Sequence, residues 1–256
     1  MRLLQQSFII DAFSGIWVDM LQRTLWIWGI TLLWPYAAAN PNLDTVRGIL
    51  QTEAAPQAYP TPIPGTYEFA IGNDIFYLSE DGRYLIKGEM IDLQTRENLA
   101  EARRQANRMQ RIQAIDVKEM IVYPATDETR YVVYVFMDTD CPYCRMLQQD
   151  IDEYNRQGIE MRFLAFPRGG PNSPAFHRAI SIWCAQDRHQ AMAAAQEGYD
   201  IAQRACPNTV REQYATGLQM GVTGTPALVL EDGTLVQGFM AAPNLAQFLT
   251  NHFSPR

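Results

Sequence analysis

Short runs in which apolar and polar residues alternate follow a proline-rich stretch in the first half of the chain. Residues 67–71, 75–78 and 84–86 form these runs, and Gly72-Asn73-Asp74 and Asp81-Gly82 separate them. Alternation with a period of two, bounded by turn residues, is typical of antiparallel strands joined by tight turns. The pattern therefore predicts a small antiparallel sheet.

A different pattern begins at residue 131, where the apolar positions become continuous. Residues 131–137 form an unbroken run of β-branched and aromatic residues, which is typical of a strand buried on both faces. A helical pattern follows from residue 144 to Gly158, and residues 159–166 form a second apolar run. Strand, helix and strand in this order predict a parallel βαβ unit.

The remainder of this second domain is predicted to be mainly helical, with a hairpin near its end. The helical stretch covers residues 174–220. Residues 227–230 and 234–236 then flank a Glu231-Asp232-Gly233 turn, which predicts the hairpin. Residues 244–253 place their apolar side chains on one face and predict a closing helix.

Polar, helix-favouring residues connect the two domains. Between residues 95 and 116 the apolar positions are sparse and comprise Leu99, Met109 and Ile112. So few apolar positions predict an exposed connecting helix. The preceding sheet holds few large apolar residues, and a unit of that size is marginally stable alone, so we expect a partner to stabilise it.

The first forty residues have the pattern of a targeting segment. An apolar run at residues 25–33 is followed by Ala37-Ala38-Ala39, an A-x-A cleavage site. The run is shorter than the roughly 20 residues that span a bilayer. We therefore expect residues 1–39 to be a signal peptide rather than an anchor. Because residues 1–19 are long and acidic for such a segment, we expect translation to begin at Met20.

Composition narrows the class of partner. The chain is 47% hydrophobic, enough for a substantial core, and 21 basic against 28 acidic residues give a net charge of −7. Surfaces that bind nucleic acid are basic, so we expect no nucleic-acid partner. We also expect no bound cofactor.

The residues with the clearest chemistry are Cys141-Pro142-Tyr143-Cys144, at the junction of a predicted strand and a predicted helix. Cys141 would stand at the helix N-terminus, where free N–H groups and the macrodipole favour a thiolate and lower the pKa below about 8.5. The i, i+3 spacing puts both sulfurs on one face, so Cys144 can resolve a mixed disulfide. Pro142 suits the first helical turn, and Tyr143 is a tuning position of unassigned sign. The motif predicts thiol–disulfide exchange.

A zinc site and a structural disulfide are the other uses that cysteines have in proteins. A zinc site would need two more soft ligands at comparable spacing, and only the isolated Cys184 and Cys206 and three scattered histidines remain, so we expect no metal. A structural disulfide between Cys184 and Cys206 is the plain interpretation, worth about 3 kcal/mol in the chain-entropy model. A second redox pair stays open as the alternative.

Five stretches resemble the periplasmic disulfide isomerases of the DsbC and DsbG family. They are residues 118–123, the Cys-Pro-Tyr-Cys motif with its strand, and residues 163–168, 182–185 and 221–227. The resemblance runs through most of the mature chain. It implies an α+β or α/β architecture: a thioredoxin-like fold with a helical insertion, preceded by a small antiparallel β dimerisation domain and a linker helix.

The resemblance also implies a division of the chain and a set of partners. The expected parts are a signal peptide at 1–39, an N-terminal dimerisation domain at 40–94, a linker helix at 95–117 and a thioredoxin-like catalytic domain at 118–256. The family implies a periplasmic homodimer whose cleft binds misfolded, disulfide-containing exported proteins. It further implies a DsbD-type membrane partner that supplies electrons.

The resemblance assigns roles that pattern alone does not. On pattern alone, Pro226 is a proline tolerated at the first residue of a strand. The family implies that Pro226 is cis and that Thr225 presents its backbone to the substrate beside Cys141. It also implies that Cys184 and Cys206 are bonded structurally.

The chain departs from the family pattern at two places. Pro142-Tyr143 resembles the DsbG dipeptide more than the Gly-Tyr of typical DsbC, and Val135 stands where ordinary thioredoxins have a buried aspartate. We expect isomerisation, and reduction, of incorrect disulfides in exported proteins. The alternatives are a monomeric dithiol oxidase or reductase, which the N-terminal sheet disfavours, and a holdase chaperone whose thiols are secondary.

Overall fold

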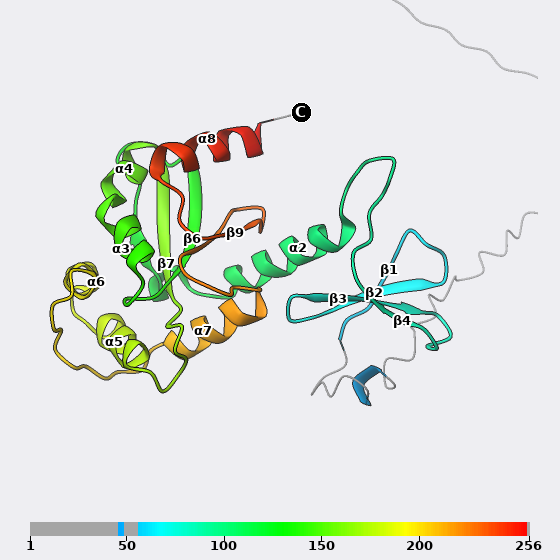
Figure 1. The fold of residues 1–256 in the computed structure, drawn as a ribbon, viewed down its shortest axis with the longest axis horizontal. Coiled ribbons are helices and arrows are strands. Elements are labelled where there is room, and N and C mark those ends of the chain that lie inside the picture. The colour runs from blue at the N-terminus through cyan, green and yellow to red at the C-terminus, as the bar shows by residue number, and fades with distance from the viewer. Residues whose placement is uncertain (1–45, 49–55, 255–256) are drawn as a thin grey trace, which may run out of the picture. The chain divides into compact units, whose positions relative to one another are not determined.

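The computed structural model describes residues 46–48 and 56–254 (Figure 1). The predicted signal peptide at 1–39 and the predicted start at Met20 lie outside these residues. Residues 46–48 are helical. Within the described part of the chain, no helix is both long enough and apolar enough to cross a bilayer.

The N-terminal sheet has four antiparallel strands in the order β1-β2-β3-β4. They are β1 (Tyr59–Pro60), β2 (Thr66–Ile71), β3 (Asp74–Ser79) and β4 (Leu85–Lys87). Gly72, at a φ of 60° that favours glycine, begins the two-residue turn between β2 and β3. The three predicted strands are confirmed. The two residues of β1 were not predicted, because so short a strand in a proline-rich stretch leaves no alternating pattern.

Each face of this sheet carries its own small apolar cluster. On one face Phe69 stacks on Phe76 with the ring centroids 5.4 Å apart. On the other, Ile75 and Tyr77 pack with Ala100, which lies on the following helix. Both clusters contain few residues, as expected of a domain that is marginal by itself.

The connecting helix α2 runs over Leu99–Gln113, shorter at both ends than the predicted segment. Its N-terminus is set by Asn98, whose side chain accepts a backbone N–H of the first turn. The helix was expected to be exposed, but Ala100, Arg108 and Ile112 are buried. The hydrophobic pattern does not predict the burial of Arg108, because arginine is a polar residue. Its guanidinium is buried with hydrogen bonds to two backbone carbonyls.

The second domain is built on a five-stranded sheet in the order β5-β7-β6-β8-β9. Its strands are β5 (Ile121–Tyr123), β6 (Tyr131–Met137), β7 (Ile159–Ala165), β8 (Ala227–Val229) and β9 (Leu235–Gln237). Strands β6 and β7 are parallel, and the other neighbours are antiparallel. The predicted parallel unit and the C-terminal hairpin are therefore confirmed, and β5 is an additional edge strand.

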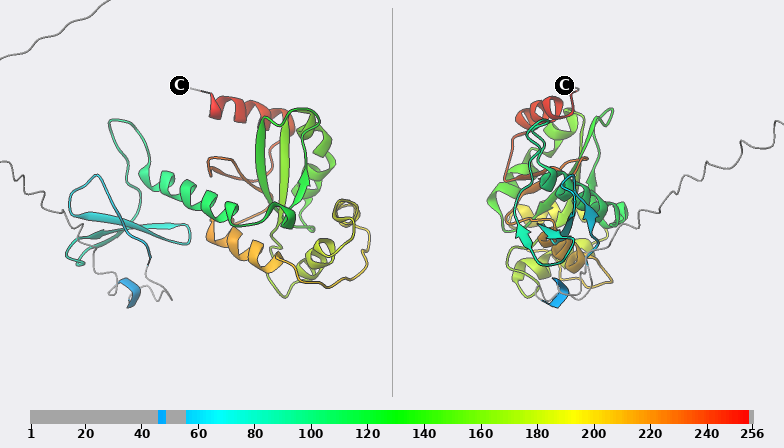
Figure 2. Two further views of the ribbon diagram at one scale, coloured as in Figure 1. Left: turned by 180° about the vertical axis from the view of Figure 1, so that it is seen from behind. Right: turned by 90° about the vertical axis from the view of Figure 1, so that its right-hand side faces the viewer.

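Helices cover both faces of this sheet (Figures 1 and 2). A 3-10 turn, η1, precedes β5, and the helices are η1 (Val117–Glu119), α3 (Pro142–Gln149), α4 (Ile151–Arg156), α5 (Pro174–Trp183), α6 (Arg188–Gln196), α7 (Val210–Gln219) and α8 (Ala242–Phe253). The single helix predicted between β6 and β7 is broken at Asp150, which ends α3 and begins α4.

The alternating side chains of β6 enter two separate cores. Val133 and Val135 belong to a cluster with α3, α4, α5, α6 and α8. Tyr134 and Phe136 belong to a second cluster, on the side of α2 and α7. The continuous apolar run thus reflects a central strand buried on both faces. Its last residues, Phe136 and Met137, are buried, and the Cys-Pro-Tyr-Cys motif begins four residues after the strand ends.

Candidate active site

The Cys-Pro-Tyr-Cys motif lies where β6 leads into α3. Cys141 is the N-cap residue of α3, with an extended backbone, and Pro142 is the first helical residue. Cys144 follows one turn into the helix. Both thiols are free, Cys141 is 2% exposed and Cys144 is fully buried. The two sulfurs therefore share one covered site at a helix N-terminus.

The pKa of the Cys141 thiol is lowered from 9.0 to about 5. The largest cause is a hydrogen bond from the Cys144 thiol, and burial works against it. The Thr225 hydroxyl and the backbone N–H groups of Cys144 and Tyr143 lower the pKa further. These N–H groups are the free donors of the first helical turn. The helix terminus thus acts in the expected direction, and the neighbouring thiol is the largest single cause.

The Cys144 thiol has the opposite behaviour. Burial raises its pKa, and donation of its hydrogen bond to Cys141 raises it further. At neutral pH the negative charge therefore resides on Cys141 while Cys144 stays protonated.

The loop before β8 lies directly beside the Cys141 sulfur. The peptide bond between Thr225 and Pro226 is cis. The Cys141 thiol donates to the Thr225 carbonyl, with 3.1 Å between sulfur and oxygen. The Thr225 hydroxyl is buried and has no hydrogen-bond partner. It is therefore free to donate to the thiolate once the Cys141 proton has left.

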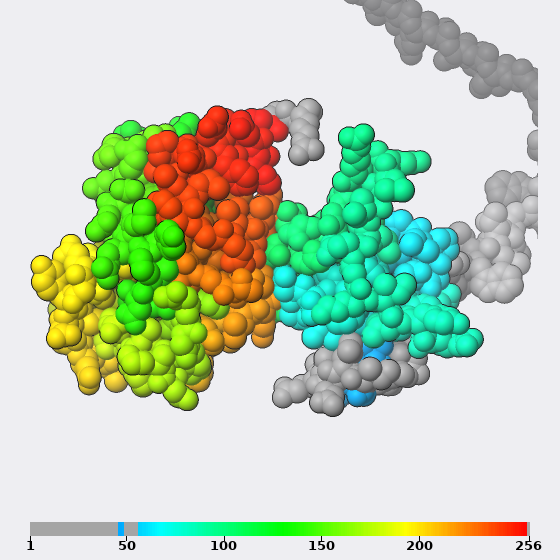
Figure 3. Space-filling view, viewed as in Figure 1, coloured from blue at the N-terminus to red at the C-terminus, as the bar shows by residue number. Residues whose placement is uncertain are grey.

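Apolar side chains are exposed around the motif. Tyr143 is 58% exposed and Met146 is 44% exposed. The Tyr143 ring stacks on Phe239, with 6.5 Å between the centroids and 25° between the planes. Helix α3 and the segment leading into α8 meet on this surface (green and orange-red in Figure 3). Sequence reasoning missed Met146 and Phe239, because only the fold brings Phe239 next to the motif.

Sequence reasoning also missed a buried carboxylate beside the motif. The sequence lacks an aspartate at Val135, but the side chain of Asp138 is only 3% exposed and pairs with Arg168 at 3.0 Å. The Asp138 carboxylate also accepts the backbone N–H groups of Arg168 and Asp140, both at 2.9 Å. A signal was available, since Asp138 directly follows a buried strand.

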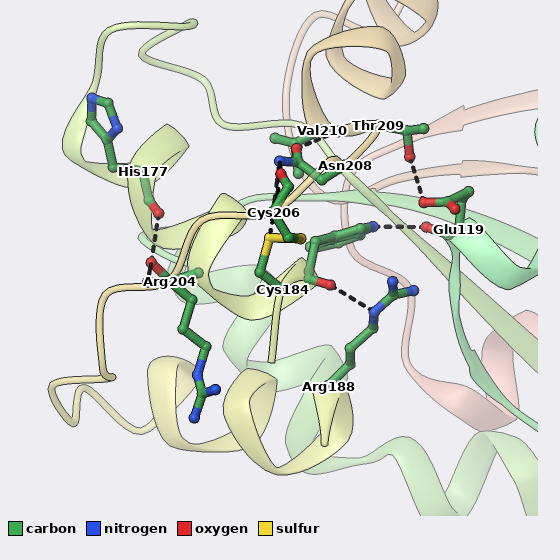
Figure 4. The surroundings of a disulfide bond; sticks show 11 residues. Glu119, His177, Cys184, Arg188, Arg204, Cys206, Asn208, Thr209 and Val210 are labelled. Carbon is green, nitrogen blue, oxygen red and sulfur yellow. Dashed lines mark hydrogen bonds between the residues drawn. A yellow bond between two sulfur atoms is a disulfide. The ribbon is translucent and has the colours of Figure 1, made fainter. Parts of the chain in front are cut away.

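Cys184 and Cys206 form a disulfide, with their Cα atoms 5.7 Å apart (Figure 4). Cys184 ends α5, and Cys206 belongs to the loop between α6 and α7. The neighbouring Asn208 donates its side-chain amide to the Cys206 carbonyl at 2.8 Å. Because the two sulfurs bind one another, they cannot complete a metal site with Cys141 and Cys144.

The fold and the site together define a class of protein. A parallel βαβ unit carries a Cys-x-x-Cys motif at a helix N-terminus, and a cis-proline loop contacts the first cysteine. This arrangement is that of a thioredoxin-fold thiol–disulfide oxidoreductase. The thioredoxin-like domain family matches residues 117–253, and the disulfide bond isomerase protein N-terminal domain matches residues 38–101.

The chain belongs to the DsbC family of thiol:disulfide interchange proteins. It is 36% identical over 193 residues to thiol:disulfide interchange protein DsbC of Escherichia coli strain K12, covering 75% of this chain and 80% of that protein. It is 37% identical over 189 residues to the DsbC protein of Haemophilus influenzae, covering 74% and 81%. A solved disulfide interchange protein from Neisseria gonorrhoeae aligns at 24% identity and a TM-score of 0.48, covering 55% of this chain and 100% of that one.

Proposed function

We propose that this chain isomerises and reduces incorrect disulfides of exported proteins in the periplasm, with Cys141 as the attacking residue and Cys144 as the resolving residue. The observation that carries the proposal is the opposite protonation of the two sulfurs. The pKa of Cys141 is about 5, whereas burial raises that of Cys144. Exchange begins with a thiolate, so Cys141 is ready to react at neutral pH.

Isomerisation follows from attack by this thiolate. The Cys141 sulfur bonds to one sulfur of an incorrect client disulfide, whose S–S bond breaks and releases the other client sulfur as a thiolate. Another client thiolate then attacks the mixed disulfide. A new client disulfide forms, and Cys141 leaves as the thiolate it was at the start. The cycle has no net oxidation or reduction.

Reduction uses the second sulfur when the mixed disulfide stalls. Cys144 loses its proton to the solvent, attacks the Cys141 sulfur and releases the client cysteine as a thiolate that takes up a proton. Because burial raises the pKa of Cys144, this step is slower than attack by Cys141 and leaves time for client rearrangement. The Cys141–Cys144 disulfide then needs two electrons, which we assign to a DsbD-type membrane partner.

We assign the N-terminal sheet to homodimer formation through its edge strand β4. All three residues of β4 are exposed, and Tyr84 and Ile86 next to and within it are each 60% exposed. An exposed edge strand offers unpaired backbone groups that a second strand can bind. A second copy of β4 would cover these side chains and enlarge a small core. The match to the disulfide bond isomerase N-terminal domain supports this assignment.

We assign client contact to the exposed surface beside Cys141. Misfolded clients expose apolar segments, and the helix that begins at Cys141 exposes two apolar residues, Tyr143, which stacks on Phe239, and Met146. When Cys141 is protonated, the Thr225 carbonyl accepts a hydrogen bond from its thiol. When the thiolate forms, that carbonyl is released and can accept a backbone N–H of the client.

A dithiol oxidase is the second candidate, and one observation favours it. A stabilised thiolate stabilises the reduced protein, which makes the disulfide form a stronger oxidant. Trapping thiols in intact cells separates the two functions. An isomerase is held mostly reduced, so both motif cysteines react with the alkylating agent. If most of the protein is recovered as the Cys141–Cys144 disulfide, the isomerase proposal is wrong.

A holdase chaperone is separated from an enzyme by one variant. Cys141→Ser is compared with the unchanged protein in refolding of a scrambled substrate and in suppression of aggregation. We expect the variant to lose refolding activity and to keep aggregation suppression. Equal refolding by the two proteins would show that the thiols are secondary.

A further inference from the structure

The loop from β6 to α3 carries two carboxylates directly before the attacking cysteine. Asp138 and Asp140 both precede Cys141 by at most three residues. Negative charge near a sulfur disfavours its thiolate. Each carboxylate is paired with an arginine from outside the loop, Asp138 with Arg168 and Asp140 with Arg178.

The two pairs differ in their exposure to solvent. The Asp138 side chain is 3% exposed, whereas that of Asp140 is 50% exposed. Solvent therefore screens the Asp140 carboxylate more strongly than the Asp138 carboxylate. Arg168 also reaches along the loop, because its guanidinium donates to the Asp140 carbonyl at 3.3 Å. Arg168 therefore holds the loop at both ends.

The pair of Asp138 and Arg168 is connected to the reactive sulfurs in two ways. The Asp138 carbonyl accepts the backbone N–H of Cys141 at 3.2 Å, so a shift of Asp138 moves the N-cap of α3. The second connection is electrostatic. The hydrogen bond to Asp138 is the largest cause that raises the pKa of Arg168, and attraction to Cys141 adds to it.

We propose that Asp138 and Arg168 form a charge-balanced positioning pair that adjusts the stability of the Cys141 thiolate and the oxidising strength of the Cys141–Cys144 couple. The inference rests on the proposed thiol–disulfide exchange and names residues that tune it. The positive charge of Arg168 favours the thiolate, and the negative charge of Asp138 opposes it. Neither residue reacts, and each acts on the sulfurs through its charge and through the loop.

The proposal predicts opposite effects of the two neutral substitutions. Asp138→Asn leaves the positive charge of Arg168 unbalanced, so the pKa of Cys141 falls and the reduced form is favoured. Arg168→Gln leaves the buried carboxylate unbalanced, so the pKa of Cys141 rises and the disulfide form is favoured. We expect each variant to change the equilibrium constant with glutathione at least about threefold, in opposite directions.

Two further variants separate charge from mere structural support. Arg168→Lys keeps the positive charge and is expected to stay within about twofold of the unchanged protein. Arg178→Gln removes the arginine of the exposed pair on the same loop. Because solvent screens that pair, we expect a smaller change than for Arg168→Gln. Should Asp138→Asn not fold, Arg168→Gln and Arg168→Lys decide between the interpretations, since Arg168 is 45% exposed.

The experiment measures the ultraviolet absorbance of the thiolate against pH, and the glutathione equilibrium, for the full chain and each variant. Opposite shifts for Asp138→Asn and Arg168→Gln support the proposal; where Asp138→Asn does not fold, a rise of the Cys141 pKa in Arg168→Gln that Arg168→Lys does not share supports it. Loss of stability with both quantities unchanged, or shifts in one direction for both variants, would overturn it. If the unchanged protein itself titrates as an ordinary thiol, the proposed function fails instead.

Discussion

Replacing Cys144 tests how the Cys141 thiolate is stabilised. The largest cause of the lowered Cys141 pKa is the hydrogen bond that the Cys144 thiol donates. Cys144→Ala removes this donor and leaves the backbone N–H groups of the first helical turn in place. Cys144→Ser keeps a donor at the same position and is the matched control.

The size of the effect follows from the energy of one charge-assisted hydrogen bond. Such a bond contributes about 1.5–3 kcal/mol, and about 1.4 kcal/mol corresponds to one pKa unit. The pKa of Cys141, about 5 in the unchanged protein, should therefore rise to roughly 6–7 in Cys144→Ala. It should stay near its original value in Cys144→Ser.

The assay is alkylation of Cys141 as a function of pH in the reduced proteins. At a pH near 6, about nine-tenths of Cys141 should be thiolate in the unchanged protein and about a quarter in Cys144→Ala. If Cys144→Ala titrates together with the unchanged protein, the neighbouring thiol is not the main donor. Equal rises in Cys144→Ala and Cys144→Ser would instead show that sulfur is required at this position.

Further predictions concern other parts of the molecule. Thr225→Val removes the unpaired hydroxyl without changing the shape, so in the same titration the pKa of Cys141 should rise, but less than in Cys144→Ala. Replacing Cys184 and Cys206 by alanine should lower the unfolding free energy, measured in urea, by about 3 kcal/mol and leave the Cys141 pKa unchanged. A shift in the reduction potential of the Cys141–Cys144 couple would instead favour a second redox pair. Ile86→Lys on the β4 edge should convert a dimer to monomers in sedimentation, and an unchanged mass would contradict the assigned interface. Because folding lowers the Cys141 pKa, the unfolding free energy of the unchanged protein should rise with pH between about 5 and 9 relative to that of Cys141→Ser. The expected slope is at most about 1.4 kcal/mol per pH unit, and a flat profile would contradict the lowered pKa.

The hydrophobic pattern predicted the positions of the long strands and helices well. Strand β6 was predicted over residues 131–137 and is found there, because its continuous apolar run reflects burial on both faces. The short strands β1 and β5 have two and three residues and leave no periodic signal. The break at Asp150 between α3 and α4 was missed for the same reason, since one residue interrupts an otherwise helical pattern.

The candidate site was predictable only where its residues are close in sequence. The spacing of Cys141 and Cys144 predicted a shared helix face. It did not predict that a hydrogen bond from the Cys144 thiol would be the largest single cause of the stabilised thiolate. Asp138 and Arg168 are 30 residues apart and meet only because β6 and β7 are parallel neighbours. Contacts of this kind depend on strand register, which a single sequence does not specify.

Carbon NMR of the cysteine β-carbons against pH tests the central claim most directly, because it reports the protonation of each sulfur without requiring access by a reagent. In the reduced protein we expect the Cys141 signal to titrate with a midpoint near 5. The Cys144 signal should stay that of a protonated thiol throughout the neutral range. Two signals that titrate together near the value of a free thiol would contradict the division of roles between these cysteines.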